Sequence, residues 1–391
     1  MKLSPNQGIP RHIIWLMAAM AGLTVANLYY NQPLLEMMRS DLRTTSSLAN
    51  LIAVITQAGY ALGLFFIVPT GDLISRRKII VVCMIVAALM TVLIGVSNHV
   101  YVIWAASLLM GVCSIVPQLF IPIAGQFSEP QNKTRNMGYV LSGLLIGILT
   151  ARVISGMVGE WFGWRTMYYI AGILMITCLV LTLWLMPHTQ QNFTGTYPSL
   201  MRSLVNICTQ HPHIRLCSLR AAFGFGSMLA FWACLAFHLS GHPFHSGSDA
   251  VGYLGICGVA GAMVASGIGK YIPHYGVRRF SIVGASIQIV AWFTAWFLGD
   301  TYLGLILTVL LIDIGLQCLQ LSNQSACIQA VPEASNRANT IFMTTYFIGG
   351  SLGTFLAGQG WHTIGWHGVC LVGLTFALAS LSITLLFDKG K

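Results

Sequence analysis

The sequence predicts an all-α membrane protein, and three observations support that fold class. Hydrophobic residues make up 56% of the 391 positions and charged residues only 8%, a composition that a soluble domain cannot keep in solution. Apolar stretches of about 18 to 25 residues recur along the chain, each long enough to cross roughly 30 Å of hydrocarbon as a helix. They are rich in Gly, Ala and Leu and lack the alternation of barrel strands, so we expect packed helices.

Twelve membrane spans are expected. In chain order they lie near residues 13–35, 46–69, 79–98, 100–124, 137–159, 164–186, 216–239, 250–272, 279–299, 302–330, 339–360 and 365–387. The first stretch has no short apolar core with a small-residue cleavage site, so we expect a retained helix and not a signal peptide. The ten Cys residues lie in spans or loops without a CxxC pair, so no extracellular disulfide is expected.

Positive charge predicts how these spans are oriented. If the N-terminus is cytoplasmic, only Arg39, Arg43 and Arg165 lie on the outer side, and Arg152 and Arg220 lie within spans. The other 15 of the 20 Lys and Arg residues then face the cytoplasm, as the positive-inside rule requires. We therefore expect both termini to be cytoplasmic. The formal net charge of +10 then reflects topology and attraction to anionic lipid headgroups, and no nucleic-acid partner is expected.

The second half of the chain repeats the first. At a shift of 202 residues Gly147 matches Gly349, and "EPQNKTRN" returns as "VPEASNRA". The basic loop "GDLISRRK" after the second span is matched by "GKYIPHYGVRR" after the eighth. Such a parallel repeat is typical of transporters whose binding site lies between two halves. We expect an N-terminal six-helix bundle over residues 1–187, a cytoplasmic linker over 188–215 and a C-terminal six-helix bundle over 216–391.

One acid, Asp313, lies deep in the membrane by these spans. An ionisable group there costs about 2.5–3.5 kcal/mol on insertion scales, so it is a candidate functional residue. The tenth span carries a polar stripe formed by Asp313, Gln317, Gln320 and Gln324. Candidate cavity residues elsewhere are Asn27, Tyr30 and Asn31 in the first span, Ser114 and Gln118 in the fourth, and Trp232 in the seventh. The alternative for each polar side chain is a hydrogen bond to a neighbouring helix, worth about 0.6–2 kcal/mol.

Arg152 is a second charge at mid-depth. It interrupts the apolar segment "GILTARVISG", and its counterpart in the second half is the uncharged Thr354. We hypothesise that the distance between Arg152 and Asp313 changes during a transport cycle, so that Asp313 takes up a proton in one state and releases it in the other. The alternatives are a structural ion pair for Asp313, and a helix-pinning or snorkelling side chain for Arg152.

The chain resembles the major facilitator superfamily along its whole length. The six-plus-six spans and the two basic loops carry this resemblance, and "ANLYYNQPLL", "ARVISG" and "DIGLQ" resemble the YnfM-like bacterial efflux permeases, a branch related to 12-helix drug/proton antiporters. The resemblance implies alternating access by two rocking halves, with spans 1, 4, 7 and 10 around a central site, usually coupled to protons. Two features depart from the pattern: Arg152 replaces a glycine common in antiporters, and Ala26 and Asn27 lie where drug antiporters often carry an acid.

The basic loop also departs from the family pattern. The family carries an acid four residues after the loop glycine, Gly71, where this chain has Ser75. The gating role then passes to Asp72, paired with Arg76 or Arg77. We accordingly expect the cytoplasmic gate at Gly71, Asp72, Arg76, Arg77, Arg135 and Arg337.

A histidine cluster is the remaining candidate site. His238, His242 and His245 have a spacing that would suit Zn²⁺ on one helix, but Pro243 interrupts the helix, so an interfacial loop is expected instead. The chain also has no HExxH, GxSxG or Walker A motif. We therefore expect no metal, no cofactor and no catalytic residue.

Three functions remain open. The first is a proton-coupled antiporter that exports a small organic molecule by alternating access; the second is a proton-coupled uptake symporter for a small metabolite; the third is an intramembrane enzyme or receptor. The absence of a catalytic constellation and the tandem halves disfavour the third. The expected partners are a small-molecule substrate, protons and membrane lipids. The expected setting is the bacterial inner membrane, with the monomer as the functional unit.

Overall fold

The computed structural model describes residues 7–187, 195–268, 271–331 and 334–388, and within these ranges every regular element is helical. The longer helices are α1 (Arg11–Ala26), α2 (Asn31–Asp41), α3 (Ser46–Phe66), α4 (Arg76–Val96), α5 (Val100–Cys113), α6 (Val116–Phe127), α7 (Lys133–Phe162), α8 (Trp164–Leu185), α9 (Tyr197–Gln210), α10 (Pro212–Ser240), α11 (Ser248–Ile268), α13 (Val277–Leu298), α14 (Tyr302–Ala330), α15 (Ser335–Ile364) and α16 (Trp366–Phe387). Short helices are η1 (Val68–Asp72), η2 (Pro130–Asn132) and α12 (Ile272–Tyr275).

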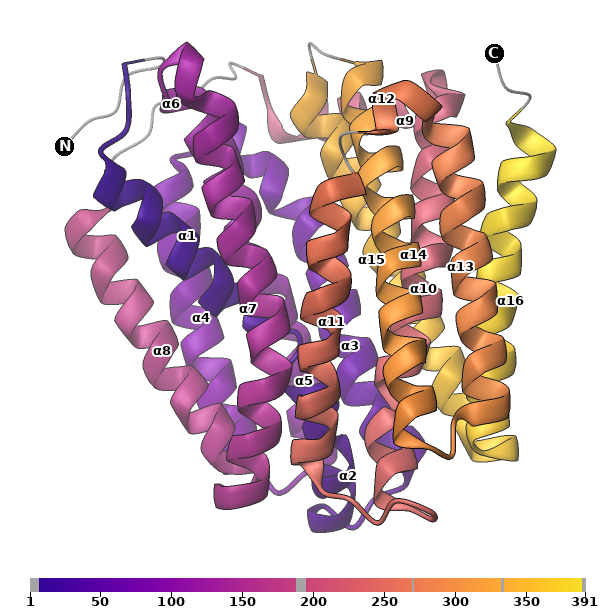
Figure 1. The fold of residues 1–391 in the computed structure, drawn as a ribbon. Coiled ribbons are helices and arrows are strands. Elements are labelled where there is room, and N and C mark those ends of the chain that lie inside the picture. Colours follow the sequence, from indigo (N-terminus) through magenta and orange to yellow (C-terminus); the bar gives the residue numbers. More distant parts are fainter. Residues whose placement is uncertain (1–6, 188–194, 269–270, 332–333, 389–391) are drawn as a thin grey trace.

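The membrane spans follow the hydropathy pattern closely. Among the described residues, 11 helical stretches are long and apolar enough to cross a membrane. The expected span near residues 250–272 corresponds to α11, a helix of 21 residues that lies among the others (Figure 1). The predicted all-α membrane fold is therefore confirmed.

Two spans that the sequence presents as single helices are broken near mid-length. The first span divides into α1 and α2 at residues 27–30, and the fourth into α5 and α6 at Ser114 and Ile115. Pro33 and Pro117 lie just beyond these breaks. A proline ring clashes with the carbonyl four residues earlier and removes one amide donor, so each break lies where the helical hydrogen bonding would fail. By contrast, α10 and α14 are unbroken helices of 29 residues each.

The helices form two groups side by side in Figure 1, with α1, α4, α7 and α8 on the left and α10, α13, α14 and α16 on the right, while α11 and α3 overlap near the middle. The start of α1, helix α9 and the end of α16 lie at one end of the molecule, which we call the α9 end. Helix α2 lies at the other end, which we call the α2 end. Across the two groups, α7 packs against α11, α3 against α15, and α2 against α10.

Glycines explain why the two halves share a sequence repeat. Gly147 on α7 faces the backbone of Gly22 on α1, and its repeat counterpart Gly349 on α15 faces the backbone of Ala222 on α10, so closely that a Cβ at either position would clash. Helix pairs in a membrane associate by such close van der Waals packing, because lipid tails are as apolar as the helices. The repeated glycines therefore specify the packing of α7 on α1 and of α15 on α10.

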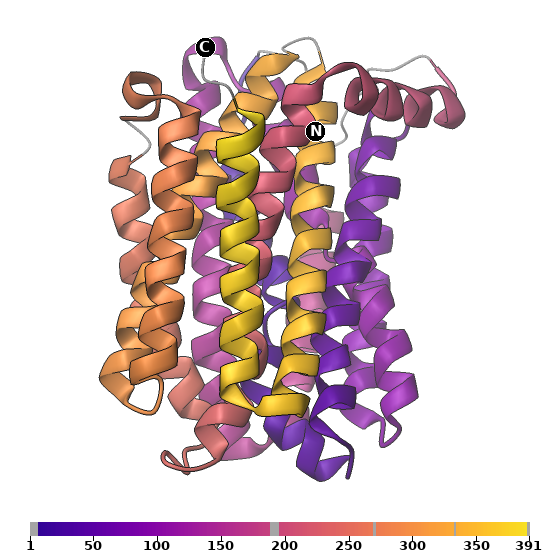
Figure 2. The same ribbon diagram turned by 90° about the vertical axis from the view of Figure 1, so that its right-hand side faces the viewer.

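Part of the expected linker is itself a helix. The 14-residue α9 lies across its end of the bundle (Figure 2) and buries Leu200, Leu204 and Ile207. The Tyr197 hydroxyl donates to the carbonyl of Phe66 at 3.2 Å, which fixes the start of α9 on α3. The sequence of residues 188–215 was predicted to be a polar linker, and this helix was not predicted. Only three of its residues are buried.

Candidate functional site

Arg152 lies at the centre of contacts between the two halves. Its side chain projects from α7 and is 3% exposed. The guanidinium carbon lies 4.9 Å from the ring centroid of Tyr29 and 4.2 Å from that of Trp232, and Nε donates to Oε1 of Gln32 at 2.7 Å. A guanidinium over an aromatic face is attracted by the ring quadrupole, by about 2 kcal/mol when desolvated. The arrangement holds a buried cation with groups from both halves.

Local structure creates the space for this cation. The turn between α1 and α2 contains Tyr29, and Gln32 follows at the start of α2. On the other side, Gly255 of α11 faces the stem of Arg152, where an added Cβ would lie 3.3 Å from the Cβ of Arg152. The helix break and the glycine together admit a long charged side chain into a packed interface.

Asp313 is the opposite charge, supplied by the other half. It lies on α14, is 9% exposed, and its carboxylate faces Gly258 of α11, where an added Cβ would lie 2.6 Å from Oδ2. Arg152 and Asp313 interact electrostatically, but their N and O atoms do not approach within 4 Å. Within the described part of the chain, Asp313 has no hydrogen bond, and Nη2 of Arg152 is buried without one. The two buried ionisable groups are therefore not paired directly, and burying either one in its charged form without a partner is costly.

The glutamine stripe continues from Asp313 along α14 toward the α9 end. Gln317 and Gln320 are half-buried, and Oε1 of Gln320 accepts a hydrogen bond from the Tyr346 hydroxyl at 2.9 Å. Nε2 of Gln324 donates to Oδ1 of Asn339 at 2.9 Å. The stripe thus joins α14 to α15.

The predicted cavity residues of the first half lie mostly among its own helices. The Asn27 amide contacts Sδ of Met175 at 3.3 Å, the Asn31 amide contacts Oγ1 of Thr56 at 3.3 Å, and Tyr30 is 4% exposed. The Ser114 hydroxyl donates to the carbonyl of Met110 at 2.7 Å, and Nε2 of Gln118 contacts the Tyr60 hydroxyl at 3.4 Å. The structure therefore brings Trp232 and Asp313 to Arg152 but not Asn27, Asn31 or Ser114.

Sequence reasoning did not single out three residues of this centre. Tyr29 and Gln32 contact the guanidinium of Arg152. On an unbroken helix, the neighbouring residues Tyr30 and Asn31 were instead predicted to line the cavity. The signal that could have found them is Pro33, because a helix break before it changes which side chains share a face. Tyr346 on α15 was not predicted, because its hydroxyl donates to Gln320 on α14 and the sequence does not show contacts between different helices.

Three of the six expected gate residues line a cavity at the α9 end. Arg76 donates to Oδ1 of Asp72 at 3.2 Å and to Oε1 of Gln126 at 3.0 Å. A cavity of about 420 Å³ is lined by Asp72 and Arg76 from one half and by Arg337 from the other. An added Cβ at Gly71 would lie 3.2 Å from Cγ of Arg76.

The remaining two gate candidates lie outside that cavity's lining. Arg77 donates to the carbonyl of Leu183 at 2.5 Å and so fixes α4 on α8. Arg135 lines a separate cavity together with Glu129 and Arg11. The structure therefore groups Gly71, Asp72, Arg76 and Arg337, and places Arg77 and Arg135 elsewhere.

At the α2 end, hydrogen bonds join the halves directly. Oε2 of Glu160 on α7 accepts from the backbone amide of Ser248, the first residue of α11, at 3.0 Å, and the Ser248 hydroxyl donates to the carbonyl of Gly156 at 2.8 Å. Nδ2 of Asn50 on α3 donates to the carbonyl of Thr354 on α15 at 2.8 Å. These bonds join α7 to α11 and α3 to α15 at the α2 end.

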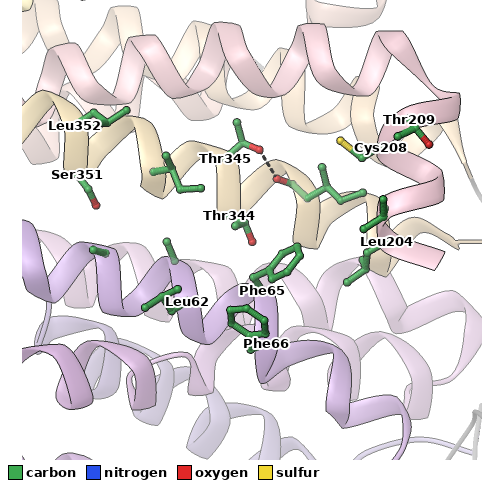
Figure 3. A pocket seen from close by; sticks show the side chains of 15 residues that line it. Leu62, Phe65, Phe66, Leu204, Cys208, Thr209, Thr344, Thr345, Ser351 and Leu352 are labelled. Carbon is green, nitrogen blue, oxygen red and sulfur yellow. Dashed lines mark hydrogen bonds between the residues drawn. The ribbon is translucent and has the colours of Figure 1, made fainter. Parts of the chain in front are cut away.

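An apolar pocket of about 610 Å³ opens between α3, α15 and α9. Figure 3 shows Phe65 and Phe66 on one wall, Thr344 and Thr345 on the facing helix, and Leu204 from α9. No charged side chain lines this pocket, and it lies apart from the site around Arg152.

The histidine cluster is divided between a helix and a loop. His238 lies within α10 and stacks on Trp366 with ring centroids 4.1 Å apart, and its Nε2 lies 3.0 Å from the carbonyl oxygen of Gly299. His242 and His245 follow the end of α10, with ring centroids 6.1 Å apart. The described residues contain no group of three or more metal-ligating side chains arranged to hold an ion.

Two packed groups of helices around a buried polar centre, with 11 membrane-length apolar helices among the described residues, define a multi-pass membrane protein. The family model of the Major Facilitator Superfamily matches residues 14–354, so the chain belongs to this superfamily.

Relatives and solved structures agree. The chain is 32% identical to the transporter YgaY of Escherichia coli O157:H7, over 97% of this chain and 96% of that one. It is 25% identical to the inner membrane transport protein YnfM of Escherichia coli K12, over 98% and 94%. The crystal structure of the nucleoside transporter NupG superposes with a TM-score of 0.74 at 15% identity, over 98% and 100% of the two chains. The predicted superfamily fold is thus confirmed.

Proposed function

We propose that this transporter exports a small organic molecule in exchange for protons. The observation that carries the proposal is the pair of buried, opposite charges, Arg152 on one half and Asp313 on the other, close enough to interact but not in contact. Since the two residues belong to different halves, any rocking of the halves changes their separation. We infer that this separation controls the proton on Asp313.

The physical reasoning follows from charge and burial. When Arg152 is near, the ionised carboxylate of Asp313 is stabilised by Coulomb attraction; when the cation moves away, the buried carboxylate is favoured in its neutral form. Proton uptake in one state and release in the other would couple transport to the proton gradient. Tyr29 and Gln32 support the proposal because they belong to the same half as Arg152 and keep the guanidinium with that half when the two halves move.

Orientation and gating belong to the same proposal. We place the α9 end in the cytoplasm, because most Lys and Arg residues lie there, and the α2 end outside. The bonds of Glu160 and Asn50 would then be the closed outer gate, and Asp72, Arg76 and Arg337 would meet when the cytoplasmic gate closes. In this assignment the residues 1–187 and 216–391 move as two bodies joined by the linker, and the protein works as a monomer in the inner membrane.

The unpaired charges also favour a class of substrate. A zwitterionic molecule would satisfy Asp313 with a cationic group and the free Nη2 of Arg152 with an anionic one, and Gln317 is half-buried beside them for further polar contacts. Satisfying a buried charge recovers part of its desolvation cost. We therefore rank polar and zwitterionic molecules ahead of uncharged apolar ones.

The test uses everted membrane vesicles and a ligand found by thermal-shift screening of metabolites and antibiotics. Asp313→Asn should abolish proton-driven transport but leave substrate exchange measurable. The control is Asp300→Asn, the same chemical change at an acid whose side chain is 74% exposed, and it should transport normally. Unimpaired proton-driven transport in Asp313→Asn would disprove the coupling role. Proton movement in the same direction as the substrate would establish the alternative, an uptake symporter.

A further inference from the structure

A large cavity with a basic rim lies at the α9 end of the second half, away from the site around Arg152. Its volume is about 1220 Å³, and it is formed by the first turns of α10, by α12 and the start of α13, and by the end of α16. We call it the basic cavity. Its lining residues are Pro212, His213, Arg215, Leu216, Leu219, His274, Tyr275, Gly276, Val277, Arg278, Arg279, Ile383, Phe387 and Asp388.

The charges around the basic cavity are almost all positive. Arg215, Arg278 and Arg279 are exposed. Asp388 is the one acid among the lining residues, and its Oδ2 accepts from Nη2 of Arg220 at 2.7 Å, so its charge is balanced by a buried arginine. The cavity therefore has three arginines at its rim and attracts anions.

Helix termini add to this attraction. Gly276 has a φ of +80°, a conformation that favours glycine and lets the chain turn from α12 into α13. Arg278 and Arg279 therefore lie in the first turn of α13, which begins at Val277, and Arg215 lies in the first turn of α10. At neither helix does a side chain cap the first turn. Cations are unfavourable at a helix N-terminus, where free amide groups prefer an anion. Nη1 of Arg215 donates to the carbonyls of Cys208 and Thr209 at 3.2 and 3.0 Å, whereas Arg278, Arg279 and the two uncapped N-termini keep their preference for negative charge.

Below the rim, the walls of the basic cavity are apolar and accessible. Leu219 is 43% exposed and Phe387 is 71% exposed, and Leu216 and Ile383 also line the cavity. These residues belong to helices long and apolar enough to span the bilayer. A cationic rim above an accessible apolar wall matches a molecule with an anionic head and hydrocarbon tails.

We propose that the basic cavity binds an anionic phospholipid, with its phosphodiester headgroup held by Arg215, Arg278 and Arg279 against the starts of α10 and α13. The acyl chains lie along Leu219 and Phe387. Basic pockets between helices at the cytoplasmic membrane surface are suited to such headgroups, and each Lys or Arg near an anionic surface contributes about 1 kcal/mol, equivalent to a factor of about five in affinity.

The test is a native mass-spectrometry titration of the full-length protein in detergent with dioleoyl phosphatidylglycerol or dioleoyl phosphatidylcholine. We expect the first phosphatidylglycerol to bind at least about tenfold more tightly than phosphatidylcholine, and the double variant Arg278→Gln, Arg279→Gln to lose most of that preference. The matched control is Arg11→Gln, Arg202→Gln, which removes two exposed arginines from the same end outside the basic cavity. It should keep the preference within about twofold.

Two results would overturn the proposal. If the control variant loses as much affinity as the cavity variant, the attraction is a general surface effect and no site exists. If inorganic phosphate displaces phosphatidylglycerol at equal concentration, the acyl chains add no affinity and the cavity is a site for soluble phosphate rather than for a lipid. Leu219→Ser, which keeps every charge, adds an independent measure: it should weaken dioleoyl phosphatidylglycerol and leave the short-chain dihexanoyl form unaffected, and equal effects on both would contradict the placement of the acyl chains.

Discussion

The bond between Glu160 and Ser248 gives a sharp prediction about how the α2 end stays closed. The Glu160 carboxylate on α7 caps the first backbone amide of α11 in the opposite half, at 3.0 Å, and also lies 3.4 Å from the Ser248 hydroxyl. An acid at this position satisfies a free amide and interacts favourably with the helix dipole. Because the cap crosses between the halves, opening of the α2 end in the proposed transport cycle would break it.

The magnitude follows from these contacts. Replacing a capping side chain by Ala costs about 1 kcal/mol on average, and the exposure of Glu160 screens its charge, so no larger value is expected. Glu160→Ala should therefore shift the equilibrium between closed and open α2 ends by about 1 kcal/mol, or about fivefold toward the open form. Glu160→Gln, which keeps an acceptor oxygen, should have a smaller effect.

The assay is a distance measurement between spin labels on the two halves. Phe162→Cys at the end of α7 and Leu303→Cys at the start of α14 are 67% and 67% exposed at the α2 end, and the partly accessible Cys208 and Cys257 are first replaced by Ser. Pulsed electron resonance in lipid nanodiscs then reports the populations of short and long distances.

A matched control separates gating from general surface charge. Glu36 lies at the same end and forms a bidentate pair with Arg39 three residues along α2, at 2.7 and 2.5 Å, so it joins no helix of the other half. Glu36→Ala should leave the distance distribution unchanged. An unchanged distribution in Glu160→Ala, or an equal shift in Glu36→Ala, would refute the reasoning.

Three further predictions concern packing and the central site. Gly147→Ala forces a Cβ into the backbone of α1 and should lower the melting temperature by several degrees, whereas Gly138→Ala on the same helix meets no atom within 4 Å and should not; equal melting temperatures would argue against the close contact. Asn50→Ala removes the bond to the Thr354 carbonyl and should open the α2 end by about 1 kcal/mol in the same spin-label assay, and a purely thermal destabilisation without a distance change would contradict this. Arg152→Lys keeps the charge but not the planar stacking, so substrate transport should fall at least about tenfold; wild-type transport rates would show that the aromatic contacts are dispensable.

The sequence by itself determined the helical membrane fold, the order of its apolar helices and the repeat, and it predicted the depth of the two charges. Hydropathy is a local property, and a fixed rise per residue converts position into depth, so Arg152 and Asp313 are both placed near mid-membrane from the chain alone. The repeated glycines also follow from sequence, because each half must solve the same packing problem.

Which side chains meet was decided only by the tertiary structure. Apolar composition does not tell a lipid-facing side chain from a core-facing one, since both surroundings are equally apolar. The helix breaks before Pro33 and Pro117 then change the faces on which Tyr29 and Ser114 lie, so a continuous helical periodicity selects the wrong neighbours there. The contacts of Arg152 with Tyr29, Gln32 and Trp232 involve residues from different helices, and so does the capping of α11 by Glu160. Only the packing of the two halves brings these residues together.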